Sequence, residues 1–263
     1  MKKNLLLTAL TAAFLSFVLP ASAQKNQQFT NGEELTYRLH YGFINAGEAT
    51  IKVHENLYRL NDRICQRVEV AGRSTGAFDH VLRIRDSWLS YMDTTNYMPH
   101  KAVRNIEEGK YHKHEETFFD YTTKVARIEE ADEETRKVSI AERVFDMVSG
   151  YTQLRLINYD RLQKNDTIRI SGMHEDKVYK MKIVYRGKAR VKTKFGKVSA
   201  YVISPVMPKN KLFDGENSIR VWLSDDGNRI PLKIQADMFV GAVEVDLKSY
   251  KRLRNPTQLK ADD

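Results

Sequence analysis

The chain contains 263 residues, with 43 Lys and Arg against 34 Asp and Glu, and a formal net charge of +9 at pH 7. Hydrophobic residues make up 41% and charged residues 29%, a globular composition that excludes a disordered chain and a multispan membrane protein. The single cysteine, Cys65, excludes an intramolecular disulfide and any multi-cysteine zinc or iron–sulfur site.

The N-terminus has the layout of a secretory signal peptide. Met1-Lys2-Lys3 is cationic, Leu5 to Leu19 is an apolar stretch, and Ala21-Ser22-Ala23 is a small-residue cleavage site. The apolar stretch is shorter than the about 20 residues that a transmembrane helix needs. We therefore expect cleavage after Ala23 and an exported, periplasmic product that keeps no transmembrane segment.

The dominant hydrophobic period of the remaining chain is two residues. Leu35, Tyr37, Leu39 and Tyr41, for example, alternate with polar residues, as in an antiparallel sheet with one buried and one solvated face. This pattern predicts a mainly β fold: a large curved antiparallel sheet or half-barrel, in a single domain over residues 24–254. Further strands are expected at 47–53, 64–70, 81–92, 99–106, 110–119, 123–129, 136–140, 167–171, 179–185, 188–194, 198–204, 219–223, 230–236 and 243–247.

One segment has a helical period instead. Between Glu142 and Asn158, apolar residues recur at three- and four-residue steps, which predicts one main amphipathic helix packed on the sheet and two sheet halves joined across it. Glycine-containing hairpin turns are expected at 185–188 and 225–228. The polar tail, 255–263, is expected to fray.

Two groups of residues have side chains suited to catalysis or metal binding. His112, His114 and Glu116 share one face of an expected strand, but neighbours on that face lie about 6.5–7 Å apart, and two lysines flank them. Asp86 falls among apolar residues. A carboxylate in such a place can be a general acid or base, or it can belong to a structural ion pair or a solvated bend of the strand. Neither group has a known catalytic motif, so we expect no enzyme activity, catalytic residue, metal or cofactor. Cys65 is expected to be an unreactive strand residue.

A ladder of cations is the most specific charge feature. Lys188, Arg190, Lys192 and Lys194 occupy one face of one expected strand, where a lipid phosphate or an acidic polysaccharide would relieve their repulsion. The alternative is the ordinary solvated face of a basic protein. Nucleic acid is not expected, because the chain is exported and has no recognition motif.

Aromatic residues make up 10% of the chain, and many lie on apolar strand faces. A single helix leaves part of so large a sheet uncovered, and an uncovered apolar concavity is a ligand site. The residues expected to contact such a ligand are Tyr37, Tyr41, Trp88, Tyr179, Met181 and Trp222.

Several segments resemble an uncharacterised exported bacterial family known only as a domain of unknown function. They are Gly32–Tyr37, Ile44–Ala49, Asp146–Ser149, and Val221–Asp226 continued by Arg229–Leu232. The resemblance spans most of the mature chain and implies no catalytic residues.

The stretch from Trp222 to Pro231, with the later Gly241, is also similar to the closing strands of periplasmic lipoprotein carriers of the LolA/LolB type. That similarity implies a strongly curved antiparallel sheet closed by helices over an apolar cavity for acyl chains.

These observations favour a non-enzymatic periplasmic binding protein for a lipid, an acyl chain or an anionic envelope component, with peripheral contact to the membrane. The alternative from another class is an envelope assembly or scaffold protein that binds a protein or glycan partner. A hydrolase centred on Asp86 or on the two histidines is a third hypothesis. An interior filled completely by the protein's own side chains would exclude the first.

Overall fold

The computed structural model describes residues 28–206, 218–238 and 241–260, so the expected signal peptide lies outside it. Within these residues, fourteen strands form one antiparallel sheet in the order β8-β7-β6-β5-β4-β3-β2-β1-β14-β13-β12-β11-β10-β9. The predicted mainly β fold is confirmed. The strands are β1 (Glu34–Tyr41), β2 (Ile44–Leu60), β3 (Arg63–Ser74), β4 (Arg85–Asp93), β5 (Pro99–Glu108), β6 (Tyr111–Asp120), β7 (Val125–Glu130), β8 (Arg136–Ser139), β9 (Thr167–His174), β10 (Lys177–Thr193), β11 (Gly196–Pro205), β12 (Ile219–Ser224), β13 (Pro231–Met238) and β14 (Gly241–Lys251).

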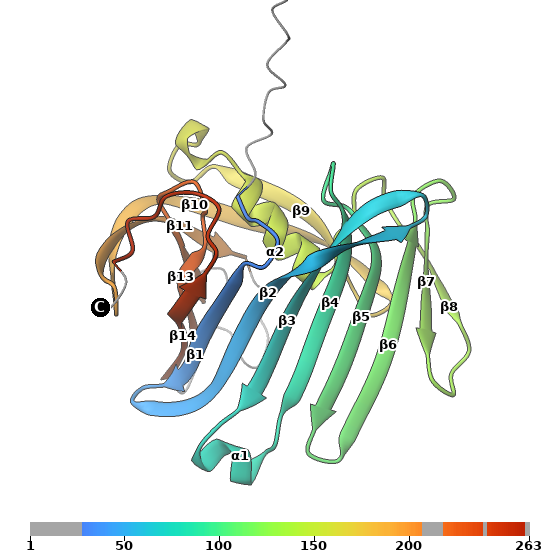
Figure 1. Cartoon of the computed structure of the whole chain (residues 1–263), viewed down its shortest axis with the longest axis horizontal. Helices are drawn as coiled ribbons and strands as arrows, with labels where there is room; N and C mark the ends of the chain where they lie inside the picture. The colour runs from blue at the N-terminus through green and yellow to red at the C-terminus, as the bar shows by residue number, and fades with distance from the viewer. Residues whose placement is uncertain (1–27, 207–217, 239–240, 261–263) are drawn as a thin grey trace, which may run out of the picture.

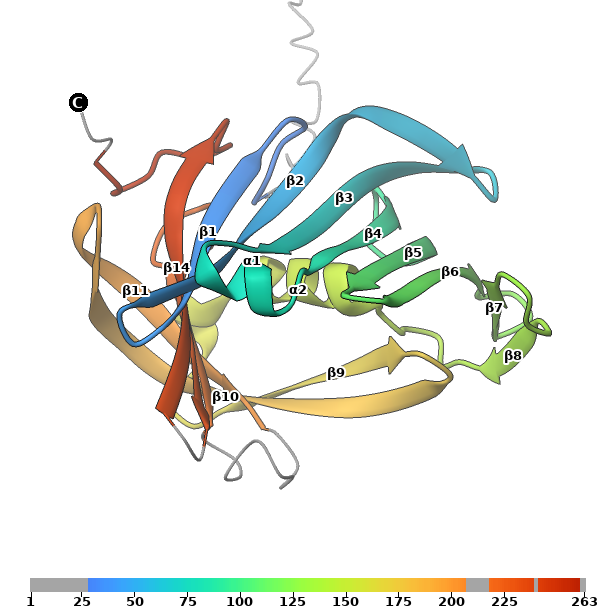
Figure 2. The same ribbon diagram turned by 90° about the horizontal axis from the view of Figure 1, so that it is seen from below.

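The sheet curls around the helix α2 (Met147–Leu156) (Figure 1). Seen from below, α2 lies between the wall that contains β2 to β5 and the β9–β10 hairpin (Figure 2). The first and last strands pair, with Leu35 opposite Tyr250, so the two halves of the sheet meet there and α2 packs across both. The strands β8 and β9 are the edges of an open sheet.

The helix begins later than predicted, at Met147 rather than Glu142. The Asp146 carboxylate caps it by accepting the N–H groups of Val148 and Ser149 at 2.8 and 3.1 Å. Before the cap, the N–H of Phe145 donates to the Ser171 carbonyl of β9. A backbone that is bonded to a strand edge cannot also form the first helical turn, so the helix starts only after Asp146.

Two other local predictions are wrong. The turn expected at 185–188 is a β-bulge inside the single strand β10, where the register with β11 shifts between Tyr185 and Gly187. The strand continues because β9 pairs with its first part and β11 with its second. The strand expected from residue 81 begins only at Arg85, because the short helix α1 (Ala77–Val81) precedes it. The turn expected at 225–228 is confirmed between β12 and β13.

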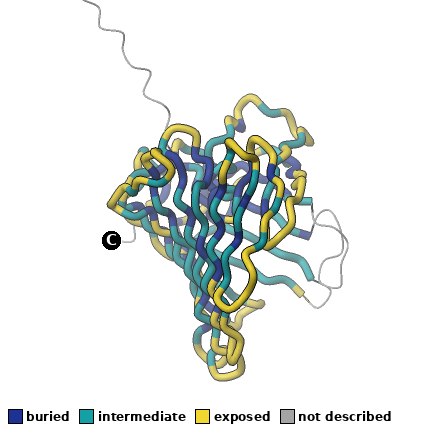
Figure 3. The backbone as a smooth tube through the Cα atoms, turned by 90° about the vertical axis from the view of Figure 1, so that its right-hand side faces the viewer, coloured by how far each residue is buried: buried dark blue, intermediate teal, exposed yellow. Residues whose placement is uncertain are grey.

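Burial follows the curvature of the sheet. Buried residues run along the middle of the strands, whereas turns and hairpin tips are exposed (Figure 3). On the concave face, Val148 of α2 packs with Val53, Val68 and Met92. The strand β11 is buried on both faces, since the adjacent residues Ala200 and Tyr201 belong to different apolar clusters.

The tail is docked rather than frayed over residues 255–260. The N–H of Asn255 donates to Asn228 Oδ1 at 2.8 Å, and the Thr257 hydroxyl donates to Asp226 Oδ2 at 2.9 Å. Leu259 is only 5% exposed and packs in the cluster around Leu35. The segment therefore covers the turn between β12 and β13.

Replacing Gly47 with alanine is expected to destabilise the protein by about 1–3 kcal/mol, because β2 and β3 approach too closely there for a side chain. A Cβ at Gly47 would lie 2.6 Å from the Arg73 carbonyl oxygen. The matched control is Gly72→Ala on β3, where a Cβ meets nothing within 4 Å. Urea denaturation of both variants checks this prediction, and equal stabilities would contradict it.

Candidate functional site

An apolar groove of about 1080 Å³ lies between α2 and the β9–β10 hairpin. Its apolar side chains come from both elements: Met147, Tyr151 and Leu154 from α2, and Ile170, Tyr179 and Met181 from the hairpin. The three α2 residues follow helical spacing on one face, whereas Val148 points to the sheet. The interior is therefore not filled by the protein's own side chains.

The groove is open to solvent. The exposed fractions of Met147, Tyr179 and Met181 are 57%, 48% and 42%, high values for large apolar residues that line one concavity. Other exposed apolar residues include Phe43, in the turn between β1 and β2, and Val81, at the end of α1, which are 97% and 84% exposed. The first group, unlike Phe43 and Val81, lines a volume the size of a ligand.

Two lysines border the groove. Lys180 and Lys182 are among the residues that line it, and alternation along β10 places their side chains on the face opposite Tyr179 and Met181. The pairing of β10 with β11 begins only at Ile183, so this part of β10 has no β11 partner. Neither lysine has an ion pair among the described residues.

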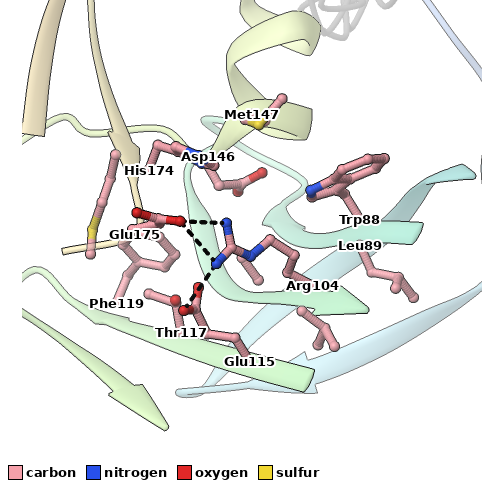
Figure 4. A pocket seen from close by; sticks show the side chains of 13 residues that line it. Trp88, Leu89, Arg104, Glu115, Thr117, Phe119, Asp146, Met147, His174 and Glu175 are labelled. Atoms are coloured by element: carbon pink, nitrogen blue, oxygen red, sulfur yellow. Dashed lines mark hydrogen bonds and ion pairs between the residues drawn. The ribbon is translucent and has the colours of Figure 1, made fainter. Parts of the chain in front are cut away.

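A small cavity of about 50 Å³, lined by both apolar and charged side chains, adjoins the groove at the start of α2. Figure 4 shows Arg104 pointing toward Glu115 and Glu175, with Nη–Oε distances of 3.3 and 3.4 Å. Glu175 belongs to the β9–β10 turn, so these ion pairs hold the hairpin tip against β5 and β6. Trp88 lines the same cavity, and its Nε1 is buried without a hydrogen-bond partner among the described residues.

Asp146 lies between this cavity and the groove, lines both of them and is half-buried. Its Oδ2 accepts the hydroxyls of Ser90 and Ser149 at 2.6 and 2.8 Å. Burial raises the pKa of Asp146 above its ordinary value, against the lowering effect of these hydrogen bonds. The carboxyl therefore fixes the start of α2 to β4, on which Ser90 lies.

The other end of α2 is held by a buried ion pair that the sequence analysis missed. Arg155 Nη1 lies 2.6 Å from Glu33 Oε1, and both residues are 1% exposed. The remaining guanidinium donors bond the carbonyls of Gln28 and Asn228 at 2.8 and 3.0 Å. This network joins α2 to the start of β1 and to the β12–β13 turn, and so fixes one wall of the groove.

The structure brings together only two of the six residues expected to contact a ligand. Tyr179 and Met181 line the groove. Tyr37 is only 2% exposed in a core cluster, so it cannot reach a ligand without local opening. Trp88 lines the small cavity instead.

The other two predicted contacts lie elsewhere. The ring of Tyr41 packs against the backbone of Gly241. Trp222 packs half-buried beside the cluster that contains Leu35, with the Arg220 guanidinium 5.8 Å from its ring. Neither residue lines the groove. Alternation along a strand shows which side chains share a face, but the curl of the sheet decides which neighbours that face meets.

The basic ladder does not face the groove. Lys192 is about 33 Å along β10 from Lys182 at 3.3 Å per residue. Lys188 Nζ lies 3.0 Å from both Asp160 and Asp225, and the bond to Asp225 in particular raises the lysine pKa. Arg190 donates to the Lys197 carbonyl at 2.7 Å. One ligand therefore cannot contact both the groove and the far end of the ladder.

The residues considered for catalysis have structural partners. Asp86 is 6% exposed and accepts the N–H of Glu107 at 3.0 Å. His114 Nδ1 lies 2.6 Å from Asn105 Oδ1 on the exposed face of β6. Burial raises the pKa of the Cys65 thiol to about 11, which removes its nucleophilic form at neutral pH.

Among the described residues, one set of side chains has the spacing of a metal site: His40, Glu244 and Asp246, whose ligand atoms lie within 4.8 Å of one another. Cations already occupy this position, however. Lys233 Nζ lies 2.7 Å from Glu244, and an Arg38 Nη lies 3.5 Å from Asp246. The donor set is therefore an ion-pair network and does not suit a divalent ion.

Neither helix in the described part of the chain has the length and hydrophobicity of a membrane-crossing segment. A search of the curated proteins finds no significant match.

Comparison with solved structures supports the fold. A crystal structure of a β-barrel-like protein of the domain of unknown function DUF1849 from Brucella abortus is similar with a TM-score of 0.55 and 11% sequence identity, over 85% of this chain and 98% of that one. The hypothetical protein CT021 from Chlamydia trachomatis is 8% identical over 89% of this chain and 93% of its own, with a TM-score of 0.39. At these identities the first likeness concerns the fold alone.

Comparison with protein families confirms the resemblance to an uncharacterised family, whereas the similarity to lipoprotein carriers stays a prediction. The family described as "Protein of unknown function (DUF3108)" matches residues 36–248. That range contains α2, the β9–β10 hairpin and every residue that lines the groove. The chain belongs to the DUF3108 family.

Proposed function

We propose that this protein is a non-enzymatic, exported binding protein that holds the acyl chain of an anionic amphiphile in the groove between α2 and the β9–β10 hairpin. The observation that carries the proposal is the groove itself: about 1080 Å³ of open space lined mainly by apolar side chains inside a curved sheet. The signal peptide expected over 1–23 places the protein in the periplasm, where lipids must cross an aqueous space.

The groove supplies enough apolar contact for a useful affinity. Burying about twelve methylene groups contributes about 10 kcal/mol, and association costs at least about 4 kcal/mol. The difference corresponds to a Kd of tens of micromolar, which permits both capture and release. Methionine and tyrosine at the mouth suit chains of different shapes, since the methionine side chain adapts readily.

The lysines select the charge of the head group. Lys180 and Lys182 are both exposed, and an ion pair in such a place is worth about 0–1 kcal/mol. They therefore contribute little to affinity but favour an anionic head group over a neutral one. A ligand held in this way would place its chain along α2 and its head at the edge of β10.

The proposal is tested with a fluorescent sixteen-carbon fatty acid and the purified mature chain. Met181→Asp is expected to weaken binding at least tenfold, because it places a charge in the apolar wall. The matched control is Val178→Asp: Val178 is 37% exposed on the same strand but does not line the groove. Equal effects of the two variants would contradict the proposal.

A second arm examines head-group selection and natural cargo. A Lys180→Gln/Lys182→Gln variant is expected to lose the preference for a fatty acid over the neutral alcohol of equal chain length. Mass spectrometry of organic extracts from the purified protein should find a lipid. A protein that is always empty and binds neither probe would exclude a carrier and favour an envelope scaffold.

A further inference from the structure

The short helix α1 turns its apolar side chains to solvent. Phe78 and Val81 are three residues apart, which places them on one side of the helix, and Leu82 follows at its end. Their exposed fractions are 43%, 84% and 44%, and no residue of α1 is buried. In a helix that stabilises a fold, such side chains pack against the core. The apolar side of α1 therefore contributes nothing to the core of this protein.

Polar contacts hold α1 in this orientation. Asp79 Oδ1 accepts the Ser74 hydroxyl at 2.5 Å and an Arg85 N–H at 2.7 Å, and Asp79 Oδ2 accepts a second Arg85 N–H at 3.0 Å. Ser74 is the last residue of β3 and Arg85 is the first of β4. The carboxylate thus ties the helix to the ends of both strands, whereas Phe78 and Val81 stay exposed.

The turn between β1 and β2 lies beside α1. Among the large apolar residues in the described part of the chain, Phe43 in this turn is the most exposed, at 97%, and Ile44 is 44% exposed. The N–H of Thr75, just before α1, donates to the Ala46 carbonyl at 3.0 Å. Both elements lie at the same end of the sheet (Figure 1), and α1 is in front when this end faces the viewer (Figure 2). We define the apolar tip as Phe43, Ile44, Phe78, Val81 and Leu82.

The charges at this end of the sheet do not oppose an anionic surface. Across 41–46 and 75–83 the one carboxylate is that of Asp79, which the Arg85 guanidinium pairs with, and Arg83 is an exposed cation. The adjoining β5–β6 turn adds charges of both signs: Glu107, Glu108 and Lys110. Together these groups balance, three against three, while the net charge of +9 on the whole chain favours approach to anionic lipids.

The area and shape of the apolar tip favour a membrane over a second protein. At their exposed fractions, its five side chains present on the order of 500 Å² of apolar surface, whereas a stable protein interface buries about 800 Å² on each partner. The side chains stand on a turn and on a short helix, and a packed protein interface needs one complementary face. A lipid interface needs no such complementarity, because apolar side chains insert into it one by one.

We propose that the apolar tip docks this protein reversibly on a membrane surface that contains anionic lipids, with Phe43, Phe78 and Val81 inserted at the level of the head groups. So few side chains bind about as weakly as one acyl anchor, whose association constant is about 10⁴ M⁻¹. The protein therefore exchanges between the membrane and solution. None of the tip residues lines the acyl groove, so the docking surface does not depend on a ligand in the groove.

The test measures sedimentation of the purified mature chain with phosphatidylcholine vesicles, with and without phosphatidylglycerol. Phe43→Asp/Val81→Asp is expected to lower the partition coefficient at least tenfold, because it puts charges in place of inserted apolar side chains. The matched control is Leu57→Asp/Ile64→Asp, which makes the same changes at residues that are 50% and 49% exposed near the opposite end of β2 and β3. This control should bind vesicles as the wild type does.

A fluorescent label locates the contact. Cys65 is 0% exposed, so a cysteine introduced by Phe43→Cys can be labelled selectively with a polarity-sensitive dye. Vesicles should shift the emission of this label to the blue, as in an apolar medium. The same label at Leu57→Cys should not shift, and equal shifts at both positions would contradict insertion through the tip.

Loss of vesicle binding in the tip variant, with binding kept in the control, supports the proposal for either vesicle composition. No binding of the wild type to either vesicle overturns it, as does an equal loss in both variants. A wild-type dimer that Phe43→Asp/Val81→Asp converts to a monomer, measured by sedimentation velocity without lipid, would identify a second copy as the occupant and would also overturn it. Met181→Asp should keep vesicle binding, so failure of the acyl groove and failure of the tip are distinguishable.

Discussion

Replacing Arg155 by alanine is expected to lower the free energy of unfolding by about 3–5 kcal/mol. Arg155 is 1% exposed, and its guanidinium bonds Glu33 and the carbonyls of Gln28 and Asn228. Without it, the Glu33 carboxylate stays buried with no cation beside it, and two buried carbonyls lose their donors. Urea denaturation followed by circular dichroism at pH 7 measures the loss.

Two further variants separate the ion pair from a general effect of losing an arginine. Arg161→Ala removes an exposed arginine six residues later and should change stability by less than about 0.5 kcal/mol. The double variant Glu33→Met/Arg155→Met removes both charges and should recover most of the loss, because no unpaired charge remains buried. A cost below about 1 kcal/mol for Arg155→Ala would show that the network does not hold α2 in place.

The fold was predictable because alternation is a local property of each strand. The Leu35–Tyr41 pattern needs only its own residues to show that Leu35 and Tyr37 are on the buried face. The start of α2 was not predictable in this way. The residue that keeps Phe145 extended is Ser171, which lies 26 positions later and becomes its neighbour only after the sheet has curled.

The groove was predictable in kind but not in its full composition. Tyr179 and Met181 could be identified from the sequence as apolar residues on a strand of an incompletely covered sheet. Arg155 could not, because an arginine in an amphipathic helix is normally solvated and its partner Glu33 is 122 positions away. Glu33, Asp146 and Arg229 all lie in the segments that carry the family resemblance, and these three segments meet at α2. The family resemblance was therefore the one available sequence signal for these residues.

Replacing Asp146 by alanine is expected to cost about 2–4 kcal/mol. The loss of an N-cap contributes about 1–2 kcal/mol, and the buried hydroxyls of Ser90 and Ser149 lose their shared acceptor. Asp146→Asn is the matched variant. An asparagine oxygen can still accept from the N–H groups of Val148 and Ser149, so this variant should keep most of the stability.

The pH dependence of the asparagine variant gives the sharper result. Burial raises the pKa of Asp146 in the folded state above its ordinary value of 3.8, so the folded protein holds this proton more tightly than the unfolded chain does. The stability that Asp146 contributes is therefore greatest below about pH 4, falls as the pH rises through the folded-state pKa, and is constant above it. Carboxylates with lowered pKa values, such as Asp93, act in the opposite direction but are present in both proteins. The difference in unfolding free energy, Asp146→Asn minus wild type, should thus increase from pH 4 upward and then level off. A difference that is flat or decreases with pH would show that burial does not destabilise the ionised form of Asp146.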